Sequence, residues 1–277
     1  MRKIPYLHII LFVLTFLSTL AVGAMHEGIN IFAEPLKIYK GLPFSVALLF
    51  ILLTHELSHY MASRKHGVKA TLPYFIPAPT IFGTLGAFIK MKSQITTKNA
   101  LMDIGASGPI AGFVVSVIVT VIGLSFSKIM PVESVEGAIT LGDSILFTGL
   151  TKLIIGTVPD NHDVFLHPVA FAGWIGFFVT ALNLMPVGQL DGGHIAYALL
   201  GEKHKTLSKI LIGIMITLGV FYWEGWLIWA LLLIVFGFRH PPIIYSEIPL
   251  DSKRRIIGKI AMIIFILTIT PMPIQII

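Results

Sequence analysis

Two histidines and a glutamate form a candidate zinc site within one apolar segment of the sequence. His55, Glu56 and His59 match the pattern H-E-x-x-H, and residues four apart lie on one face of a helix. Both imidazoles can therefore bind a single zinc ion, while the Glu56 carboxylate can take a proton from a water beside the metal. The chemistry that this arrangement predicts is hydrolysis assisted by a metal ion.

The motif lies in a segment that is long and apolar enough to cross a membrane. Residues 42–62 read LPFSVALLFILLTHELSHYMA, and about 20 apolar residues span a bilayer. Ionisable side chains are costly at that depth and usually have a function. The first hypothesis is therefore a zinc hydrolase that works within the bilayer. In the alternatives, the histidines are packed polar groups of a helix or belong to a transport pathway.

The composition of the whole chain is that of a polytopic membrane protein. Of the 277 residues, 55% are hydrophobic and only 12% are charged, and the mean hydropathy is +0.87; soluble domains are far more polar. The net charge of +6 comes from basic residues in short loops, which favours membrane topology over a nucleic-acid partner. No cysteine is present, so disulfides are excluded and any zinc must be held by His, Asp or Glu.

Apolar stretches predict an α-helical polytopic membrane protein with six or seven transmembrane helices. They fall at residues 5–24, 42–63, 101–126, 168–187, 207–223, 225–238 and 256–274. The fifth and sixth are short and could be one bent segment. Three regions follow from this order: a first helix with an external loop at 1–41, a catalytic membrane core at 42–194, and C-terminal helices at 195–277.

Basic residues predict the orientation of these helices. Arg2 and Lys3 precede the first span, and Arg64 and Lys65 follow the second, so the positive-inside rule assigns both ends to the cytoplasm. His55 lies roughly 13 Å along a helix from Arg64, which places the metal inside the hydrocarbon but nearer the cytoplasmic face. No transit peptide precedes the first span, so the expected location is a prokaryotic plasma membrane.

The connection between the second and third spans is expected to be a short β-rich insertion on the cytoplasmic side. Prolines interrupt residues 66–98, and residues 82–89 (FGTLGAFI) are typical of a short strand. An open strand at membrane depth needs a partner, so a segment of another protein could add as a strand at 83–89. A hairpin that only covers the protein's own surface explains the pattern equally well.

A second polar motif supplies a third ligand, which a catalytic zinc site needs. Asp191 follows the fourth span in the run NLMPVGQLDGGH at residues 183–194. Pro186 and Gly188 should break the helix, and the turn and the glycines after it can return the Asp191 carboxylate to the metal. The alternative is a capping aspartate in a turn. His194 is close to this region and could support the metal ligands from behind, although a loop histidine is the expected interpretation.

The two motifs together resemble the signature of the site-2 protease family of intramembrane zinc metalloproteases. H-E-L-S-H in one span and N-x-x-P-x-x-x-L-D-G in a later one match that family in order and separation, over residues 43–194. Gly188 and Gln189 stand where many relatives have prolines, as in the branch without a PDZ domain. The resemblance implies a chain that cleaves transmembrane segments of substrate proteins in the lipid bilayer.

The resemblance also implies a role for each polar residue. His55, His59 and Asp191 would bind one zinc ion, Glu56 would be the catalytic base, and Asn183 would stabilise the oxyanion. An amide donor beside the metal suits that last role, although Asn183 could equally bridge helices through hydrogen bonds.

Two other functions are compatible with these patterns. A membrane transporter or metal carrier could use the intramembrane histidines, and a non-catalytic pseudoprotease could bind membrane helices without cutting them. A transporter needs neither Glu56 between the histidines nor Asp191 in its motif, and the complete set of four residues favours catalysis over a pseudoprotease. The patterns leave the oligomeric state undetermined.

Small residues at the start of the third span predict close helix packing rather than chemistry. Residues 105–112 read GASGPIAG and contain G-x-x-x-G at 108–112, a spacing that lets two helix backbones approach. His66, His204 and His240 are expected in basic loops without a role.

Overall fold

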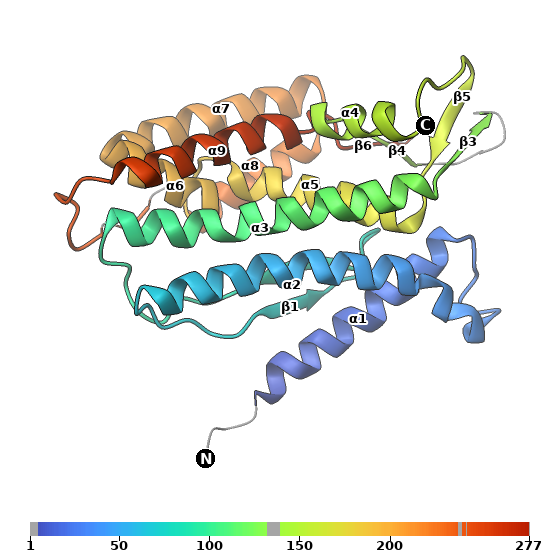
Figure 1. Ribbon diagram of the computed structural model, residues 1–277, viewed down its shortest axis with the longest axis horizontal. Helices are drawn as coiled ribbons and strands as arrows, with labels where there is room; N and C mark the ends of the chain where they lie inside the picture. The colour runs from blue at the N-terminus through green and yellow to red at the C-terminus, as the bar shows by residue number, and fades with distance from the viewer. Residues whose placement is uncertain (1–4, 132–138, 238–239, 242, 277) are drawn as a thin grey trace.

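The computed structural model describes residues 5–131, 139–237, 240–241 and 243–276, and α-helices dominate this part of the chain (Figure 1). Arg2 and Lys3, on which the predicted orientation partly depends, lie outside the described residues. The α-helices are α1 (Tyr6–His26), α2 (Leu42–Lys65), α3 (Lys98–Ser125), α4 (Ile145–Ile154), α5 (Pro168–Leu184), α6 (Asp191–Leu200), α7 (His204–Phe221), α8 (Gly225–Phe236) and α9 (Ser252–Thr268). Short 3-10 helices cover Pro35–Gly41 and Gly201–Lys203.

Three antiparallel pairs of short strands complete the described fold. The pairs are β1 (Tyr74–Pro77) with β2 (Thr84–Phe88), β3 (Lys128–Pro131) with β5 (His162–Phe165), and β4 (Ile139–Leu141) with β6 (Ile274–Ile276). The predicted class, a helical membrane protein with small β elements, is confirmed at this level.

The predicted number of six or seven spans is not confirmed. Among the described residues, four segments are long and apolar enough to cross a membrane: Tyr6–His26, Pro35–Lys65, Lys98–Ser125 and Asp191–Phe221. Helix α5 has only 17 residues and α8 only 12, which is short for a bilayer of about 30 Å. The last predicted span, 256–274, ends as a helix at Thr268, because Pro271 and Pro273 follow it and cannot continue the backbone hydrogen bonding.

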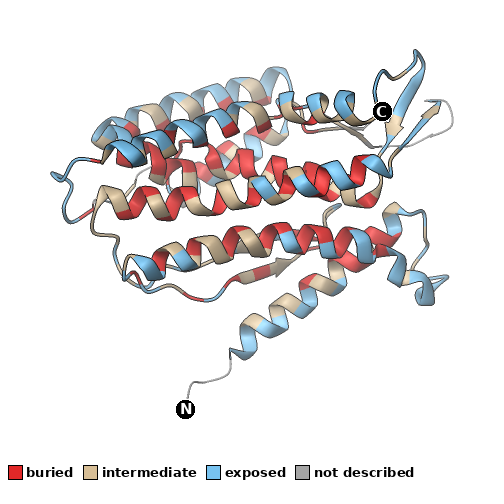
Figure 2. Ribbon diagram, in the orientation of Figure 1, coloured by how far each residue is buried: buried red, intermediate tan, exposed pale blue. Residues whose placement is uncertain are grey.

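Helix α3 is the centre of the bundle, since it packs against both α2 and α5. Figure 2 shows the buried residues concentrated along these three helices, where Leu48, Ile104 and Trp174 are almost fully buried. The opposite faces are apolar as well: Phe50 is 56% exposed and Ile118 is 53% exposed. Apolar residues on the outside of a bundle are expected where the surroundings are lipid rather than water.

Glycines of α5 let its backbone lie directly against side chains of α3. A Cβ at Gly173 would lie 2.2 Å from Thr120 Oγ1, and one at Gly176 would lie 2.1 Å from Ser116 Oγ. Larger residues at either position would push the helices apart, and lipid-embedded helices associate mainly through such close van der Waals contact.

The predicted strand at 82–89 forms a hairpin with the chain's own preceding segment. Strand β2 pairs with β1 in the register Tyr74 to Phe88 and Phe75 to Ala87. Polar side chains of α1 hold this hairpin: Ser18 donates to Gly83 O at 2.6 Å, and His26 Nε2 lies 2.9 Å from Ile81 O. Strand β2 has β1 as its one strand neighbour in the described sheet, so its second edge has no strand paired to it there.

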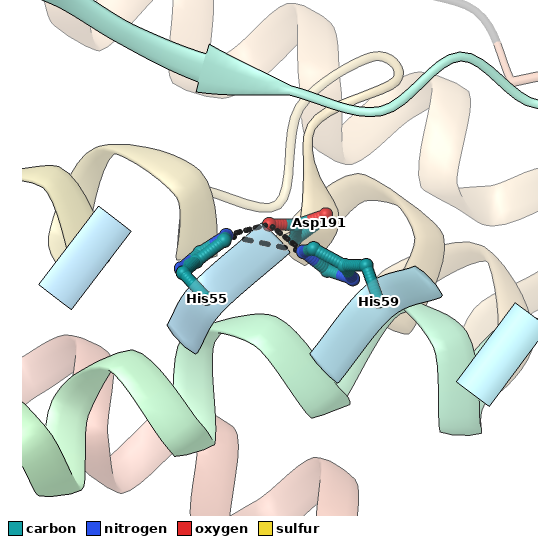
Figure 3. Close-up of side chains that lie close together, drawn as sticks. All are labelled: His55, His59 and Asp191. Carbon is teal, nitrogen blue, oxygen red and sulfur yellow. Dashed lines mark hydrogen bonds and ion pairs between the residues drawn. The ribbon is translucent and has the colours of Figure 1, made fainter. Parts of the chain in front are cut away.

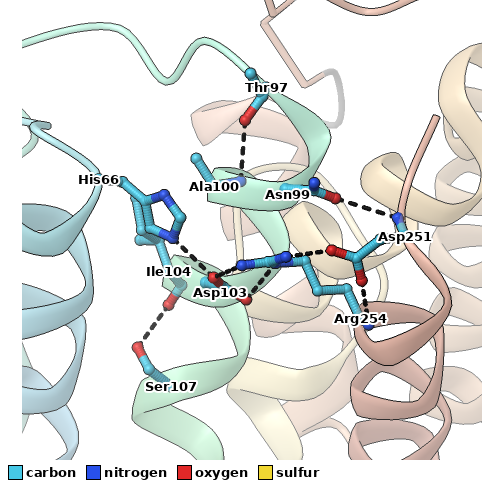
Figure 4. Close-up of polar contacts among 9 residues, drawn as sticks. All are labelled: His66, Thr97, Asn99, Ala100, Asp103, Ile104, Ser107, Asp251 and Arg254. Atoms are coloured by element: carbon cyan, nitrogen blue, oxygen red, sulfur yellow. Dashed lines mark hydrogen bonds and ion pairs between the residues drawn. The ribbon is translucent and has the colours of Figure 1, made fainter. Parts of the chain in front are cut away.

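An ionic cluster ties together the ends of α2, α3 and α9 (Figure 4). Arg254 donates two hydrogen bonds to the Asp103 carboxylate, from Nε at 2.7 Å and from Nη2 at 2.5 Å. His66 Nε2 lies 2.7 Å from the same carboxylate, and Arg254 also pairs with Asp251. The backbone N–H of Arg254 holds the pKa of the Asp251 carboxyl below its usual value. His66 therefore has a structural partner that its place in a basic loop did not predict.

We expect Asp103→Asn to lower the thermal stability of the detergent-solubilised protein. The substitution removes the charge that binds Arg254 through two hydrogen bonds, and a hydrogen bond to a charged group contributes about 1.5–3 kcal/mol. Thermal unfolding followed by circular dichroism measures the effect, with Lys253→Gln as a control because Lys253 is an exposed neighbouring charge. Equal melting temperatures for the two variants would contradict a stabilising role for the cluster.

Candidate metal centre

Two helices bring the three predicted ligands together (Figure 3). His55 and His59 project from consecutive turns of α2, and Asp191 is the first residue of α6. Asp191 Oδ2 lies 3.3 Å from His55 Nε2 and 3.1 Å from His59 Nε2, and the two imidazole nitrogens are 3.1 Å apart. Within the described part of the chain, this is the group of three metal-ligating side chains that the geometry brings together.

The separations of these atoms fit a tetrahedral zinc ion. Zinc binds nitrogen at 2.0–2.1 Å, so two ligands at a tetrahedral angle are about 3.3 Å apart. Two neutral imidazoles and one carboxylate are a ligand set of catalytic zinc, which keeps its fourth position for water. Both histidines are about 95% buried, with 4% and 5% exposure, so water competes little with the protein ligands.

The tautomer of His59 also suits metal binding. Its Nδ1 lies 2.7 Å from the carbonyl oxygen of Ile104. A carbonyl oxygen only accepts hydrogen bonds, so Nδ1 carries the proton and is the donor. In the neutral ring, Nε2 is then unprotonated and faces Asp191. A backbone acceptor that orients a ligand histidine in this way is common around bound metals.

The small residues of α3 lie directly against the two histidines that are predicted to bind the metal. A Cβ at Gly108 would be 2.1 Å from His59 Nε2, and a Cβ at Gly112 would be 3.1 Å from His55 Nδ1. The sequence predicted that this G-x-x-x-G pair packs helices together. The structure shows that it also makes room for the imidazoles of α2, a partner that spacing alone did not reveal.

A tight turn returns Asp191 to α2 as the sequence predicted. Helix α5 ends at Leu184, and Gly188 adopts a positive φ of 58° before α6 begins. A Cβ at Gly192 would lie 2.0 Å from Leu184 O, so the first turn of α6 rests on the end of α5. The side chain of Asp191 makes no capping bond, because the N-cap of α6 is Leu190; the alternative of a capping aspartate is wrong.

Glu56 and Asn183 line the same pocket as the three ligands, a cavity of about 550 Å³. Glu56 is buried, and its carboxylate interacts with the backbone N–H of Ile89 just after β2. The cavity therefore contains a metal-ligating group, a carboxylate that can act as a base, and an amide donor. The roles of Glu56 and Asn183 themselves stay predictions.

Two further histidines line this pocket: His194, which was expected in a loop near the ligands, and His240, to which the sequence assigned no role. His194 is not in a loop but in α6, and its Nδ1 lies 2.7 Å from His240 Nε2. Asp191 and His194 are three residues apart and therefore share one face of α6. The sequence would have indicated this if a helix had been predicted to begin at Asp191. Nothing in the sequence pairs His194 with His240, which is 46 residues away. His204 is likewise not a loop residue: it begins α7 and is 1% exposed.

Comparison with known proteins identifies the class. Residues 43–222 match the model of peptidase family M50, so the chain belongs to this family of site-2 proteases, and the resemblance seen in the sequence is confirmed. No solved structure matches the chain.

The curated relatives of this chain include three plant proteins that are named as zinc metalloproteases. One named "Probable zinc metalloprotease EGY2, chloroplastic" from Arabidopsis thaliana is 29% identical over 91% of this chain and 46% of the relative. The Arabidopsis "Probable zinc metalloprotease EGY1, chloroplastic" is 32% identical over 83% of this chain and 43% of the relative. The EGY2 protein of Oryza sativa subsp. indica is 31% identical over 60% of this chain and 30% of the relative. The chain thus spans less than half the length of these relatives.

We expect about one zinc ion per molecule in the purified protein, and much less in Asp191→Asn and His55→Ala. Each substitution removes one of three protein ligands, and the rest of the site cannot replace it. Inductively coupled plasma mass spectrometry measures the stoichiometry, with His162→Ala as the control because His162 is exposed on β5. Full zinc content in both ligand variants would show that the two motifs do not share a metal.

Gly108→Ala should also lose zinc, although it removes no ligand. The new methyl group would overlap His59 Nε2, so either the imidazole or α3 must move. Gly149→Ala is the matched control, since nothing lies within 4 Å of a Cβ there. Both variants are compared by zinc content and by melting temperature, and normal zinc content in Gly108→Ala would contradict the close contact between α3 and His59.

Proposed function

We propose that this protein is an intramembrane zinc metalloprotease that hydrolyses a peptide bond within or near a transmembrane segment of a membrane protein. One observation carries the proposal: His55, His59 and Asp191 converge in a buried pocket that also contains the Glu56 carboxylate. The apolar helices around the pocket and membership of peptidase family M50 support the same function.

In this proposal the residues of the pocket divide the chemistry between them. His55, His59 and Asp191 hold zinc, which when bound polarises the substrate carbonyl and makes the attacking water more acidic. Glu56 accepts a proton from that water and delivers it to the leaving nitrogen. The Asn183 side chain, which lines the same pocket, donates a hydrogen bond to the developing oxyanion.

We further propose that the substrate enters as an extended strand beside β2, at residues 83–89. The amides of a helix are hydrogen-bonded and shielded, so a transmembrane substrate must unwind before it can be cut, and helix-breaking residues favour this. Two observations support strand addition here. The second edge of β2 has no strand paired to it in the described sheet, and Ala87, Phe88 and Ile89 line the catalytic pocket. Backbone pairing at this edge would satisfy polar groups that lipid cannot.

The side from which water enters is proposed from charge. Helix α2 ends at Arg64 and Lys65, close to His59, and the positive-inside rule assigns such an end to the cytoplasmic face. The relatives described above are chloroplastic by name, so the expected prokaryotic plasma membrane gains no support from them. Membrane fractionation of the source cells decides between a plasma membrane and an organelle membrane.

The rival functions make different predictions. A metal carrier would move ions across liposomes in a manner that depends on His55, and a pseudoprotease would bind membrane helices without cutting them. The relatives found by comparison are named as metalloproteases and metallopeptidases, which favours catalysis over transport.

We expect the purified protein in liposomes to cut a model transmembrane peptide, and Glu56→Gln to lower the rate by at least about 100-fold, because general acid–base catalysis contributes 10²–10⁴-fold. The peptide contains about 20 Leu and Ala residues interrupted by a central Gly-Pro pair, and mass spectrometry detects the products. Glu27→Gln is the control, because Glu27 is exposed and distant in sequence from the motifs.

Two results would contradict the proposal. Wild-type turnover by a folded, zinc-loaded Glu56→Gln variant would remove Glu56 from the mechanism. Folded, zinc-loaded wild-type protein that leaves this peptide and a panel of natural single-span segments intact would favour the pseudoprotease.

A further inference from the structure

His194 and His240 form a hydrogen-bonded pair in the wall of the catalytic pocket. His194 lies one turn after Asp191 in α6, and His240 comes from the connection between α8 and α9. Both line the pocket that holds Glu56 and the metal ligands. The ring of Tyr197 stacks on His240, with centroids 4.4 Å apart and planes inclined by 18°, so the orientation of the pair is set by packing as well as by hydrogen bonding.

The hydrogen bonds determine which nitrogen of each ring carries the proton. His240 Nδ1 lies 2.6 Å from the carbonyl oxygen of Pro241, which can only accept, so Nδ1 of His240 donates. In neutral His240, Nε2 is then an acceptor. His194 Nδ1, 2.7 Å from that atom, must donate to it. The remaining nitrogen of neutral His194, Nε2, therefore has an available lone pair.

Burial favours the neutral form of His240, in which Nε2 can accept the hydrogen bond from His194. Removal from water, reinforced by the neighbouring His194, lowers the pKa of His240 to about 3. His240 is therefore uncharged at physiological pH, and its ring can accept from His194.

The lone pair of His194 is not part of the metal-ligating group, which among the described residues consists of His55, His59 and Asp191. An extended peptide in the pocket would present backbone N–H groups on the edge that does not pair with β2. In a membrane each of these groups needs an acceptor, because lipid supplies none and an unsatisfied group costs several kcal/mol.

We propose that His194 is a further substrate-binding residue, whose Nε2 accepts a hydrogen bond from a backbone N–H of the extended substrate. His240 acts as a positioning residue, because it holds the proton of His194 on Nδ1. The proposal rests on the proposed function, since it requires a peptide in the pocket.

Two isosteric variants test the role of His194. The side chain of Gln places an oxygen near the position of Nε2, whereas the shorter Asn reaches only the position of Nδ1. The probe is the Leu/Ala peptide with its Gly-Pro pair, bound to liposomes that contain the Glu56→Gln protein. We expect His194→Asn and His194→Ala to weaken binding about 10-fold, the effect of losing one hydrogen bond to a buried donor, and His194→Gln to retain most of it.

A purely structural role predicts the opposite order. If His194 served only to hold His240, then His194→Asn would preserve function and His194→Gln would not. Equal binding by all three variants, with normal zinc content and melting temperature, would also overturn the proposal.

Nitrogen-15 NMR of histidine-labelled wild-type protein tests the tautomer without any substrate. The resonance that disappears in His194→Gln should be that of a ring protonated at Nδ1 and unprotonated at Nε2. His240→Ala should mix the two tautomers. A ring protonated at Nε2 in the wild type would refute the proposal by itself.

These results separate the two proposals. If the wild-type protein cuts the probe but the His194 variants bind it equally well, the substrate-binding role fails and the protease assignment stands. If the Glu56→Gln protein binds no transmembrane peptide and the wild-type protein cuts none, the proposed function fails, and the role of His194 fails with it.

Discussion

The close contact between the backbone of α3 and the histidines of α2 sets the geometry of the whole site. The absence of a side chain at Gly108 lets His59 lie against α3, where Ile104 O accepts a hydrogen bond from Nδ1. This one contact therefore both places the imidazole and selects its tautomer. In lipid, no water is available to satisfy a displaced imidazole or a free carbonyl, so the arrangement must be supplied by the protein.

Glycines also allow the close packing of the other helices around the site. Gly173 and Gly176 bring α5 against α3, and the turn after α5 then carries Asp191 back to the histidines. Gly192 allows the first turn of α6 to rest on the end of α5. At the ends of the helices, Arg254 and Asp103 link α9 to α3. Polar groups thus lie between helices, while the outer faces stay apolar for lipid.

Hydrogen-bond direction gives the pocket two kinds of imidazole nitrogen. The Nδ1 atoms of His59 and His194 donate to acceptors within the protein, and their Nε2 atoms are left with lone pairs. One lone pair faces the metal site, and we propose that the other receives the substrate. A pocket lined by such groups and by the segment after β2 suits an extended peptide, whose backbone needs both donors and acceptors.

The sequence alone predicted the class of protein, and it predicted three side chains that the fold brings together as a group able to bind a metal. The two histidines of H-E-x-x-H are four residues apart and therefore lie on one face of any helix, and the composition is typical of a membrane protein. It predicted the β insertion and the turn at Asp191 from prolines and glycines, which act locally. The predicted number of six or seven spans is not confirmed, because hydropathy does not show where a helix ends. Three contacts could be found in the folded structure alone: Gly108 with His59, His66 with Asp103, and His194 with His240. Those contacts join residues between 37 and 49 positions apart, and local periodicity carries no information about which helix faces will meet.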